Sequence, residues 1–315
     1  MTAPLPPPSK TRAWVCAPGV LKAPFLSAFL PDYDLSALPG SSIEAVLGWG
    51  MKPTAEAGRR WAAKHGKPYV ALEDGFLRSV GIGEGGATSL SLIVDDLGVY
   101  YDATRPSRLE QLIDTAPDWC DATMGARARG LIDRIVASGV SKTNMGGPLD
   151  PNLLKPGRRV LIVDQTFGDA SIGYGLATEA SFSDMLATAR RDEPDAQLIV
   201  KRHPAVAAGR KQGCIPADQL QGVTLIDTDV RPADLLAAVD AVYVVTSALG
   251  FEALLRGLQV RCFGAPFYSG WGLTTDAVQT GRRGAPRDLE QIAAAALIAY
   301  TRYVDPVTGQ RCEAE

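Results

Sequence analysis

The sequence has few histidines and no patterned cysteines, and these absences exclude several common chemistries. Only His65 and His203 occur in 315 residues, and the five cysteines are dispersed. No C-x-x-C pair is present, and no cysteine lies at metal-ligand spacing from a histidine. We therefore predict a reducing compartment, with neither a disulfide framework nor a zinc site.

Long apolar runs and a strongly basic balance are also absent. The most apolar segments, 241–255 and 292–300, are too short to span a bilayer, which needs about 20 apolar residues, or are interrupted by Glu252. The net charge of -3 argues against nucleic-acid binding, which usually depends on a basic surface. Residues 1–12 are rich in proline without an apolar core, so we expect a disordered leader and not a signal peptide. These features predict a cytoplasmic protein.

Short β-branched runs alternate with helical patterns, which is typical of parallel sheets covered by helices. In the first half we expect strands at 13–17, 45–48, 69–73 and 90–95 and helices at 55–65 and 107–116. In the second half we expect strands at 159–164, 197–202, 223–226, 241–245 and 261–263, and helices at 177–191, 233–239, 251–256 and 289–303.

The chain length predicts two domains, since a domain usually holds about 100–200 residues. Residues 141–158 contain adjacent glycines, three prolines and two asparagines, a composition typical of a linker. We predict an α/β fold with two Rossmann-like domains, at 13–140 and 159–315, whose last helix can pack back on the first domain. A cleft between two domains is the usual place for a small-molecule site.

Polar residues end two predicted strands of the second half. Asp164 ends one strand, and the cluster Lys201, Arg202, His203 and Pro204 ends the next. Because the carboxyl ends of parallel strands meet at one crevice, we expect these residues to face a common site for an anionic substrate. His203 changes charge most readily near neutral pH, and Pro204 stops the strand. A structural role for a lone histidine is the alternative.

Two loops after buried strands can either approach a ligand or cap a helix. Residues 165–175 begin with Gln165 and include Gly168 and two further glycines, but their spacing is not G-x-G-x-x-G, so a dehydrogenase is disfavoured. Residues 246–253 place Ser247 and Gly250 at a helix start that can hold a phosphate, and Glu252 can accept hydrogen bonds from ribose hydroxyls. Ordinary N-capping is the alternative for both loops.

Two carboxylates, Glu73 and Asp74, end a strand of the first half ahead of a glycine turn and Arg78. A carboxylate that faces the cleft can act as general base toward a hydroxyl. The alternative is a turn with an ion pair to Arg78.

Residues 95–98 are interpreted as a hairpin turn, and the adjacent aspartates there point to opposite faces, so no metal site is predicted. The aromatic loop 263–274 can cover a ring or fill a domain interface.

Five segments in this order closely resemble the bacterial capsule polysaccharide biosynthesis proteins of the retaining β-Kdo transferase type, and the resemblance covers nearly the whole chain after the leader. The segments are 72–81 (LEDGFLRSVG), 100–107 (YYDATRPS), 163–166 (VDQT), 201–204 (KRHP) and 267–274 (FYSGWGLT). Proteins of this type often carry two related modules in tandem, and this chain holds one.

The resemblance implies a GT-B-like fold, with an N-terminal acceptor-side domain and a C-terminal nucleotide-binding domain. It implies transfer of 3-deoxy-D-manno-octulosonic acid (Kdo) from CMP-Kdo to a glycan or lipid-linked acceptor, at the inner face of the inner membrane. Peripheral membrane contact is left open, since no strongly basic amphipathic helix is present. The alternatives are a GT-B enzyme that uses another activated sugar, a sugar-nucleotide epimerase, or a non-catalytic sugar-nucleotide-binding module of a capsule assembly complex.

The resemblance also implies residue roles. Asp164 would attack the anomeric carbon in the first of two displacements. His203 with Lys201 would hold the departing cytidylate phosphate, and either Glu73 or Asp74 would deprotonate the acceptor hydroxyl. No metal or other cofactor is expected. The remaining predicted substrate-binding residues are Gln165, Gly168, Arg202, Pro204, Ser247, Gly250, Glu252 and Arg78.

Overall fold

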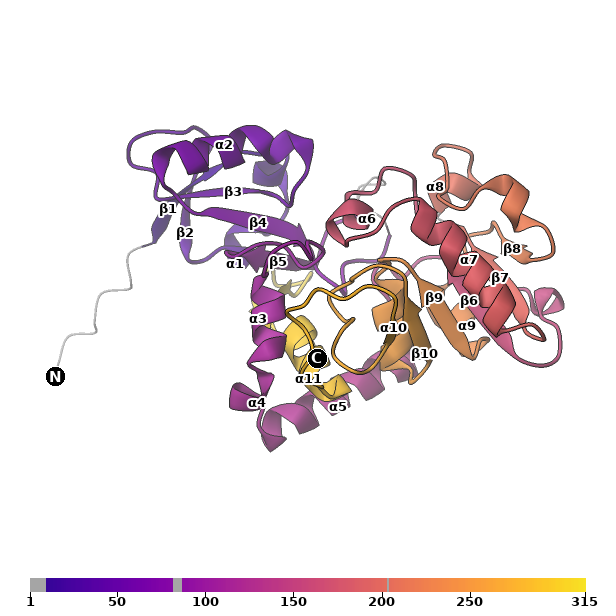
Figure 1. Cartoon of the computed structure of the whole chain (residues 1–315). Helices are drawn as coiled ribbons and strands as arrows, with labels where there is room; N and C mark the ends of the chain where they lie inside the picture. The colour runs from indigo at the N-terminus through magenta and orange to yellow at the C-terminus, as the bar shows by residue number, and fades with distance from the viewer. Residues whose placement is uncertain (1–9, 82–86, 203) are drawn as a thin grey trace.

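The computed structural model describes residues 10–81, 87–202 and 204–315 (Figure 1). Its first strand, β1 (Thr11–Val15), includes Thr11 and Arg12, which the sequence pattern places in a disordered leader. Both residues instead pair in parallel with the strand β2 (Tyr33–Ser36). Residues 1–9 of the predicted leader lie outside the described residues.

The second half of the chain forms a six-stranded sheet in the order β11-β10-β9-β6-β7-β8. All of its strand pairs are parallel. The order reverses between β6 and β9, which is the topological switch point of a Rossmann fold. The strands are β6 (Arg159–Val163), β7 (Gln197–Lys201), β8 (Thr224–Ile226), β9 (Ala241–Val244), β10 (Gln259–Cys262) and β11 (Thr275–Asp276).

The first half contributes most of a seven-stranded sheet in the order β13-β12-β5-β4-β3-β1-β2. The strands β4, β3, β1 and β2 are parallel, as predicted for the whole sheet. The prediction is wrong for β5, which is antiparallel to both β4 and β12. Its other strands are β3 (Ala45–Trp49), β4 (Tyr69–Asp74), β5 (Ser91–Asp95), β12 (Thr301–Val304) and β13 (Arg311–Cys312).

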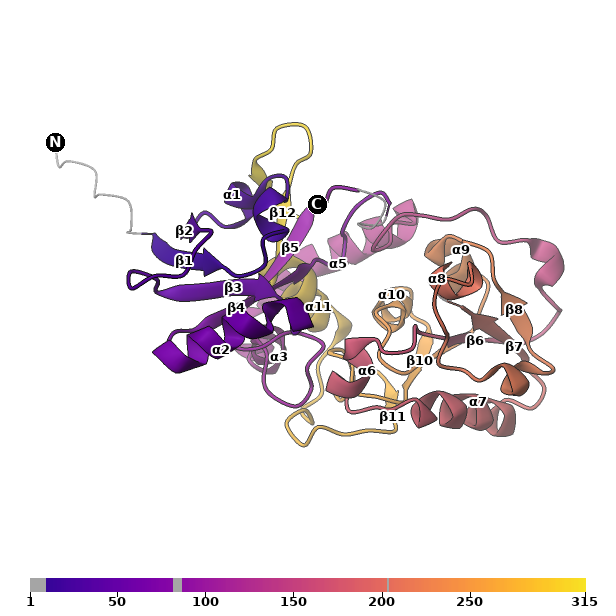
Figure 2. The same ribbon diagram turned by 90° about the horizontal axis from the view of Figure 1, so that it is seen from above.

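The end of the chain differs from the predicted helix at 289–303. The helix α11 (Leu289–Ala293) continues as a π-helical segment (Ala294–Ala299), and residues 301–304 then form β12. β12 pairs with β5 in the first sheet, so the chain returns to the first sheet after completing the second (Figure 2). Thr301, Tyr303 and Val304 are β-branched or aromatic residues that favour a strand where a neighbouring edge is open. The domain boundaries at 140 and 159 stay a prediction.

The helices lie between these strands, and several of them were not predicted. The longest helix among the described residues is α5 (Ala122–Ser138), whose N-cap Asp121 accepts a hydrogen bond from the N–H of Met124 and whose C-cap Gly139 has a φ of 68°. No helix among the described residues is long and apolar enough to cross a membrane. The other α-helices before α11 are α1 (Leu26–Phe29), α2 (Glu56–His65), α3 (Arg108–Asp114), α4 (Ala116–Trp119), α6 (Ala170–Tyr174), α7 (Ala180–Asp192), α8 (Pro204–Ala207), α9 (Pro232–Ala237) and α10 (Leu249–Leu255).

The second sheet is buried on both faces, which explains the nearly continuous apolar runs of its strands. Along β6, Val160 and Ile162 pack in one cluster with Phe182 and Leu186 of α7. Leu161 and Val163 point to the other face and belong to the cluster that contains α9 and α10. Alternate side chains along the strand therefore pack against the helices on opposite faces of the sheet.

Residues 95–98 do not form the predicted hairpin. They form a turn that the buried carboxylate of Asp95 connects to the start of α3. Its Oδ1 accepts hydrogen bonds from the N–H groups of Leu97 (2.9 Å) and Gly98 (2.8 Å). Its Oδ2 accepts from the Arg108 N–H at the start of α3 (3.0 Å) and from the Tyr300 hydroxyl (2.6 Å). This carboxylate therefore joins β5, α3 and the C-terminal π segment.

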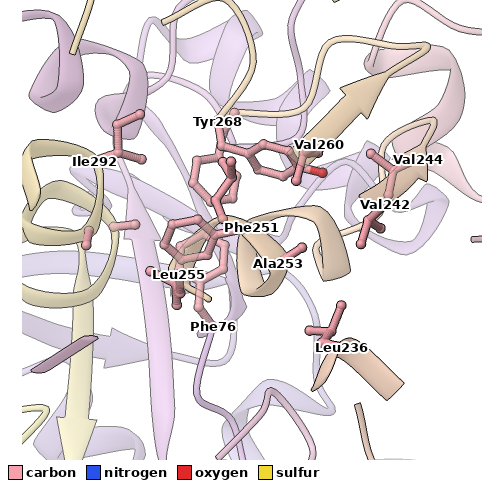
Figure 3. Close-up of a cluster of buried hydrophobic side chains, with 14 of the residues drawn as sticks. Phe76, Leu236, Val242, Val244, Phe251, Ala253, Leu255, Val260, Tyr268 and Ile292 are labelled. Atoms are coloured by element: carbon pink, nitrogen blue, oxygen red, sulfur yellow. The ribbon is translucent and has the colours of Figure 1, made fainter. Parts of the chain in front are cut away.

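One apolar core runs from the first sheet into the second. Phe76, after β4, lies with its ring centroid 5.8 Å from that of Phe251 in α10 and 4.8 Å from that of Phe267. Figure 3 shows Phe76 beneath Phe251, with Tyr268 and Ile292 in the same cluster. The aromatic loop 263–274 thus fills the interface between the two sheet units.

A buried ion cluster adds a polar connection between the same units. Glu110 of α3 is 6% exposed, and its carboxylate accepts from Arg282 Nε (2.7 Å) and Arg283 Nε (2.9 Å). Arg283 also donates to the carbonyl oxygen of Pro266 (2.6 Å), at the start of the aromatic loop. One carboxylate therefore pairs with two guanidinium groups, and Arg283 links it to that loop.

We predict that Glu110→Gln lowers the free energy of unfolding by about 3–5 kcal/mol, because it leaves the buried Arg283 charge without an anion. The measurement is the shift of the urea-unfolding midpoint. Asp34→Asn is the control: it removes the exposed ion pair with Arg12 and should cost less than about 1 kcal/mol. Equal losses in the two variants would contradict this account of the interface.

Candidate active site

A cavity of about 490 Å³ lies where the carboxyl ends of the second sheet face the loops of the first. It opens at the switch point between β6 and β9, the position at which α/β sheets bind ligands. From the second sheet unit it is lined by Val163, Asp164, Gln165, Thr166, Asp169, Ala170, Ser171, Lys201, Arg202, Thr246, Ser247, Ala248, Pro266, Phe267 and Tyr268. From the rest of the chain it is lined by Lys52, Glu73, Tyr100, Tyr101 and Lys142.

Asp164 follows β6 directly and is 4% exposed. Its Oδ1 accepts hydrogen bonds from the N–H groups of Gln165 (2.9 Å), Cys214 (3.0 Å) and Ile215 (3.0 Å). Its Oδ2 is buried and has no hydrogen-bond partner among the described residues. Burial raises the pKa of Asp164, and the three N–H groups oppose that rise without cancelling it. One oxygen is therefore held by three N–H groups, while the other packs against Gly213 without a hydrogen-bond partner among the described residues.

Gly213 leaves the space that this carboxylate occupies. A Cβ at position 213 would lie 2.2 Å from Asp164 Oδ2. The segment around Gly213 is drawn alongside the loop after β6 by hydrogen bonds from Phe167 N–H to the Gln212 carbonyl (2.8 Å) and from Cys214 N–H to the Gln165 carbonyl (3.0 Å). Residues 209–216 carry no recognisable motif, so the sequence analysis did not connect them to the site.

Gln165 ties the two strands of the switch point together. Its Nε2 donates to Thr246 Oγ1 (3.0 Å), and its Oε1 accepts from the Thr246 N–H (3.0 Å). Nε2 also lies 3.3 Å from Ser171 Oγ at the start of α6. Gln165 therefore fixes the wall between the β6 and β9 loops.

The predicted basic cluster supplies two cations to the cavity. Lys201 donates from Nζ to the Thr228 carbonyl (2.7 Å), and burial lowers the pKa of Lys201. Arg202 makes a two-pronged contact with Asp227, at 2.6 Å for each oxygen. His203 lies outside the described residues. Pro204 begins α8.

Glu73 and Asp74 have different environments, although they are adjacent on β4. Glu73 lines the cavity, and burial raises the pKa of Glu73 to about 7 although the ammonium groups of Lys142 and Lys52 lower it. Asp74 does not line the cavity; its Oδ1 lies 2.7 Å from Nε of Arg78. The ion pair to Arg78, the alternative given by the sequence, is present for Asp74, and Arg78 does not line the cavity either. Of the two carboxylates, Glu73 is the one that faces the cavity.

Of the three residues predicted to bind the nucleotide in the loop 246–253, Ser247 lines the cavity, whereas Gly250 and Glu252 do not. Gly250 packs against the Tyr268 ring, where a Cβ would lie 2.2 Å from the hydroxyl. Glu252 does not line the cavity: its Oε1 accepts from the Lys142 N–H (3.2 Å), its Oε2 is buried without a partner among the described residues, and burial raises the pKa of Glu252 to about 7. Gly168 also lies outside the lining, in a turn with a φ of 76°.

Several lining residues were missed by the sequence analysis. Lys52 lies just beyond a predicted strand, and a lysine there carries no motif. Lys142 falls in the segment interpreted as a linker. Tyr100 and Tyr101 belong to a segment that supported the family resemblance, but no role was assigned to them. Among the described residues, no group of three or more His, Cys, Asp and Glu side chains is arranged to hold a metal ion.

The two sheets and the cavity at the switch point define a GT-B-like α/β protein with its site between two sheet units, as predicted. The chain belongs to the capsule polysaccharide biosynthesis protein family, whose model matches residues 44–132 and 123–303. The predicted family membership is therefore confirmed.

Curated relatives share much of this sequence. The chain is 45% identical over 311 residues to the capsule polysaccharide modification protein LipA of Neisseria meningitidis serogroup A, covering 95% of this chain and 44% of LipA. It is 42% identical over 275 residues to the lipopolysaccharide-processing protein LpsZ of Rhizobium meliloti, covering 86% of this chain and 62% of LpsZ. The chain thus spans about half the length of these relatives.

Two solved structures are similar along nearly the whole chain. The Thermosulfurimonas dismutans KpsC β-Kdo 2,4 transferase is 41% identical, with a TM-score of 0.91 and coverage of 96% of this chain and 95% of that one. The β-Kdo 2,7 transferase of KpsC from the same organism is 27% identical, with a TM-score of 0.73 and coverage of 97% and 96%.

We predict that two glutamate carboxyl groups, those of Glu73 and Glu252, titrate near pH 7 in ¹³C NMR of the folded protein. Glu73→Gln should remove one transition and Glu252→Gln the other. Lys142→Met should raise the pKa of both groups, because the Lys142 ammonium lowers both pKa values. Lys64→Met, on the exposed side of α2, is the matched control and should move neither.

The raised pKa values of Glu73 and Glu252 also determine how the free energy of unfolding changes with pH. A glutamate whose pKa is raised on folding destabilises the native state as pH rises from its unfolded value of about 4.3 through 7. Glu73→Gln should therefore gain stability over the wild type above pH 7 and not below pH 4. Titration of both carboxyl groups near 4.3 would contradict this account of the site.

Proposed function

We propose that this chain is a retaining β-Kdo glycosyltransferase that transfers Kdo from CMP-Kdo to a glycan or glycolipid acceptor in capsular polysaccharide biosynthesis. The observation that carries the proposal is the similarity to the KpsC β-Kdo 2,4 transferase, at a TM-score of 0.91 over 96% of this chain. The proposal places the protein at the cytoplasmic face of the inner membrane, where a lipid-linked acceptor would be presented.

Donor binding in this proposal uses the second sheet. The phosphate of CMP-Kdo would lie near Lys201 and Arg202 at the end of β7, with His203 as a further ligand. The nucleotide would contact the loop around Ser247. Cations held in place before the reaction stabilise the negative charge that develops on the departing phosphate.

The first displacement would use a carboxylate oxygen of Asp164. This oxygen forms a bond to the anomeric carbon while the bond from that carbon to the CMP oxygen breaks, and CMP leaves with the electron pair. The three N–H groups on Oδ1 keep the carboxylate oriented during the attack. The product of this step is a glycosyl ester on Asp164.

The second displacement would use Glu73. Glu73 takes the proton from the acceptor hydroxyl, the acceptor oxygen bonds to the anomeric carbon, and Asp164 is released as a carboxylate. Two inversions restore the β-configuration. A base with a pKa of about 7 suits this role near neutral pH.

The test is a transfer assay with CMP-Kdo and a short Kdo-terminated acceptor, in which CMP release and product mass are measured. The wild type should add one Kdo per acceptor. Asp164→Asn should lose at least about a thousandfold in rate, because the amide cannot act as the nucleophile. Asp184→Asn, an exposed change on α7, is the control and should be unaffected.

The same assay decides between the two candidate bases. Glu73→Gln should abolish transfer while donor affinity is retained, and Asp74→Asn should leave a measurable rate with the same pH dependence as the wild type. Faster turnover by a UDP-sugar would favour the alternative of a GT-B enzyme with another donor. Binding of CMP without any turnover would favour the non-catalytic module.

A further inference from the structure

Two lysines reach the cleft from the side of the first sheet without an ion-pair partner in the described part of the chain. Lys52 follows β3, and Lys142 lies in the segment between the two sheets; both line the cavity. In contrast, Arg202 on the opposite wall is paired with Asp227 at 2.6 Å. The two free ammonium groups are therefore available to a ligand.

The backbone of Lys142 is held from both sides. Its carbonyl accepts from the N–H groups of Arg78 (2.9 Å) and Ser79 (3.3 Å), which follow β4 in the first sheet unit. Its own N–H donates to the carboxylate of Glu252 on α10, in the second sheet unit (3.2 Å). The position from which the lysine side chain enters the cleft is thus set by both units.

The loop that carries Lys52 is held in a similar way. The Tyr69 hydroxyl donates to the Gly50 carbonyl (2.7 Å), and the Met51 N–H donates to the Tyr101 hydroxyl (2.9 Å). The Lys52 ammonium lies 5.7 Å from the centroid of the Trp49 ring. Lys52 is therefore an exposed residue that lines the cavity from an anchored loop.

The local charge favours an anionic ligand. Both ammonium groups act on the same carboxylate, Glu73, which burial drives toward its neutral form. Lys52 and Lys142 therefore place two positive charges on one wall of the cavity, and an anion that enters the cavity there would pair with them.

We propose that Lys52 and Lys142 form a second anion subsite, which holds a carboxylate or phosphate group of the acceptor beside the hydroxyl that reacts. The proposal rests on the proposed function. The anion belongs to the acceptor and not to the donor, because both lysines lie with Glu73, whereas Lys201 and Arg202 end β7 on the other wall. Lys52 and Lys142 would thus select acidic acceptors.

The test compares three synthetic acceptors that differ in one group next to the reacting residue: a carboxylate, its neutral carboxamide, and a neutral sugar that carries a phosphate. The value of kcat/KM is measured for the wild type, Lys52→Met, Lys142→Met, the double variant and the control Lys64→Met. The ratio between acceptors is the informative quantity, because any change in Glu73 affects all three acceptors alike.

The wild type and Lys64→Met should prefer an anionic acceptor over the carboxamide by about tenfold or more, as expected for hydrogen bonds to a charged group. Each single variant should lose part of this preference, and the double variant should lose nearly all of it. The CMP-Kdo dissociation constant should stay unchanged. A preference for the carboxylate identifies an acidic sugar as the source of the anion, and a preference for the phosphate identifies a lipid-linker phosphate.

A double variant that keeps the full preference would overturn the proposal. So would weaker CMP-Kdo binding with an unchanged preference, because the lysines would then hold the donor. If the wild type transfers nothing, the proposed function fails separately. In that case calorimetric binding of the carboxylate and carboxamide acceptors to the wild type and the double variant still decides on the subsite.

Discussion

The cleft is organised around the buried carboxylate of Asp164, which has a hydrogen-bond partner among the described residues for one of its two oxygens. Three N–H groups from two chain segments converge on Asp164 Oδ1, while Oδ2 faces Gly213 without a partner among the described residues. Burial favours the neutral form of Asp164 and the N–H groups favour the charged form, with burial the larger effect. The loop after β6, the segment around Gly213 and the Gln165 contact with β9 all serve to hold this group at the switch point.

The site also requires two sheet units in a fixed arrangement, and the chain connects them in three physically different ways. An aromatic core joins Phe76 to Phe251 and Phe267. A buried ion cluster joins Glu110 to Arg283, and through it to the loop that carries Phe267. The strand β12 returns to the first sheet. The wall that carries Glu73 is thereby kept opposite the wall that carries Asp164.

Much of the second sheet could be predicted from the sequence, because its strands are apolar runs with helical patterns between them. The C-terminal strand could not, since the alanine-rich run before Thr301 continues a helical pattern and only the open edge of β5 makes a strand favourable. The polar ends of β6 and β7 pointed to Asp164, Lys201 and Arg202. The other features of the site depend on contacts between distant segments. Asp74 forms an ion pair with Arg78, and Glu252 accepts a hydrogen bond from the Lys142 N–H. Lys52 and Lys142 line the cavity from segments without any motif.

The central claim is that Asp164 carries the sugar between two displacements. The most direct measurement is peptide mass mapping of Glu73→Gln protein after rapid mixing with CMP-Kdo and acid quench, since loss of the base should slow the second step. The account predicts one Kdo on the peptide that contains Asp164, formed as CMP is released. Stoichiometric release of CMP with no adduct, or with Kdo on a different carboxylate, would contradict it.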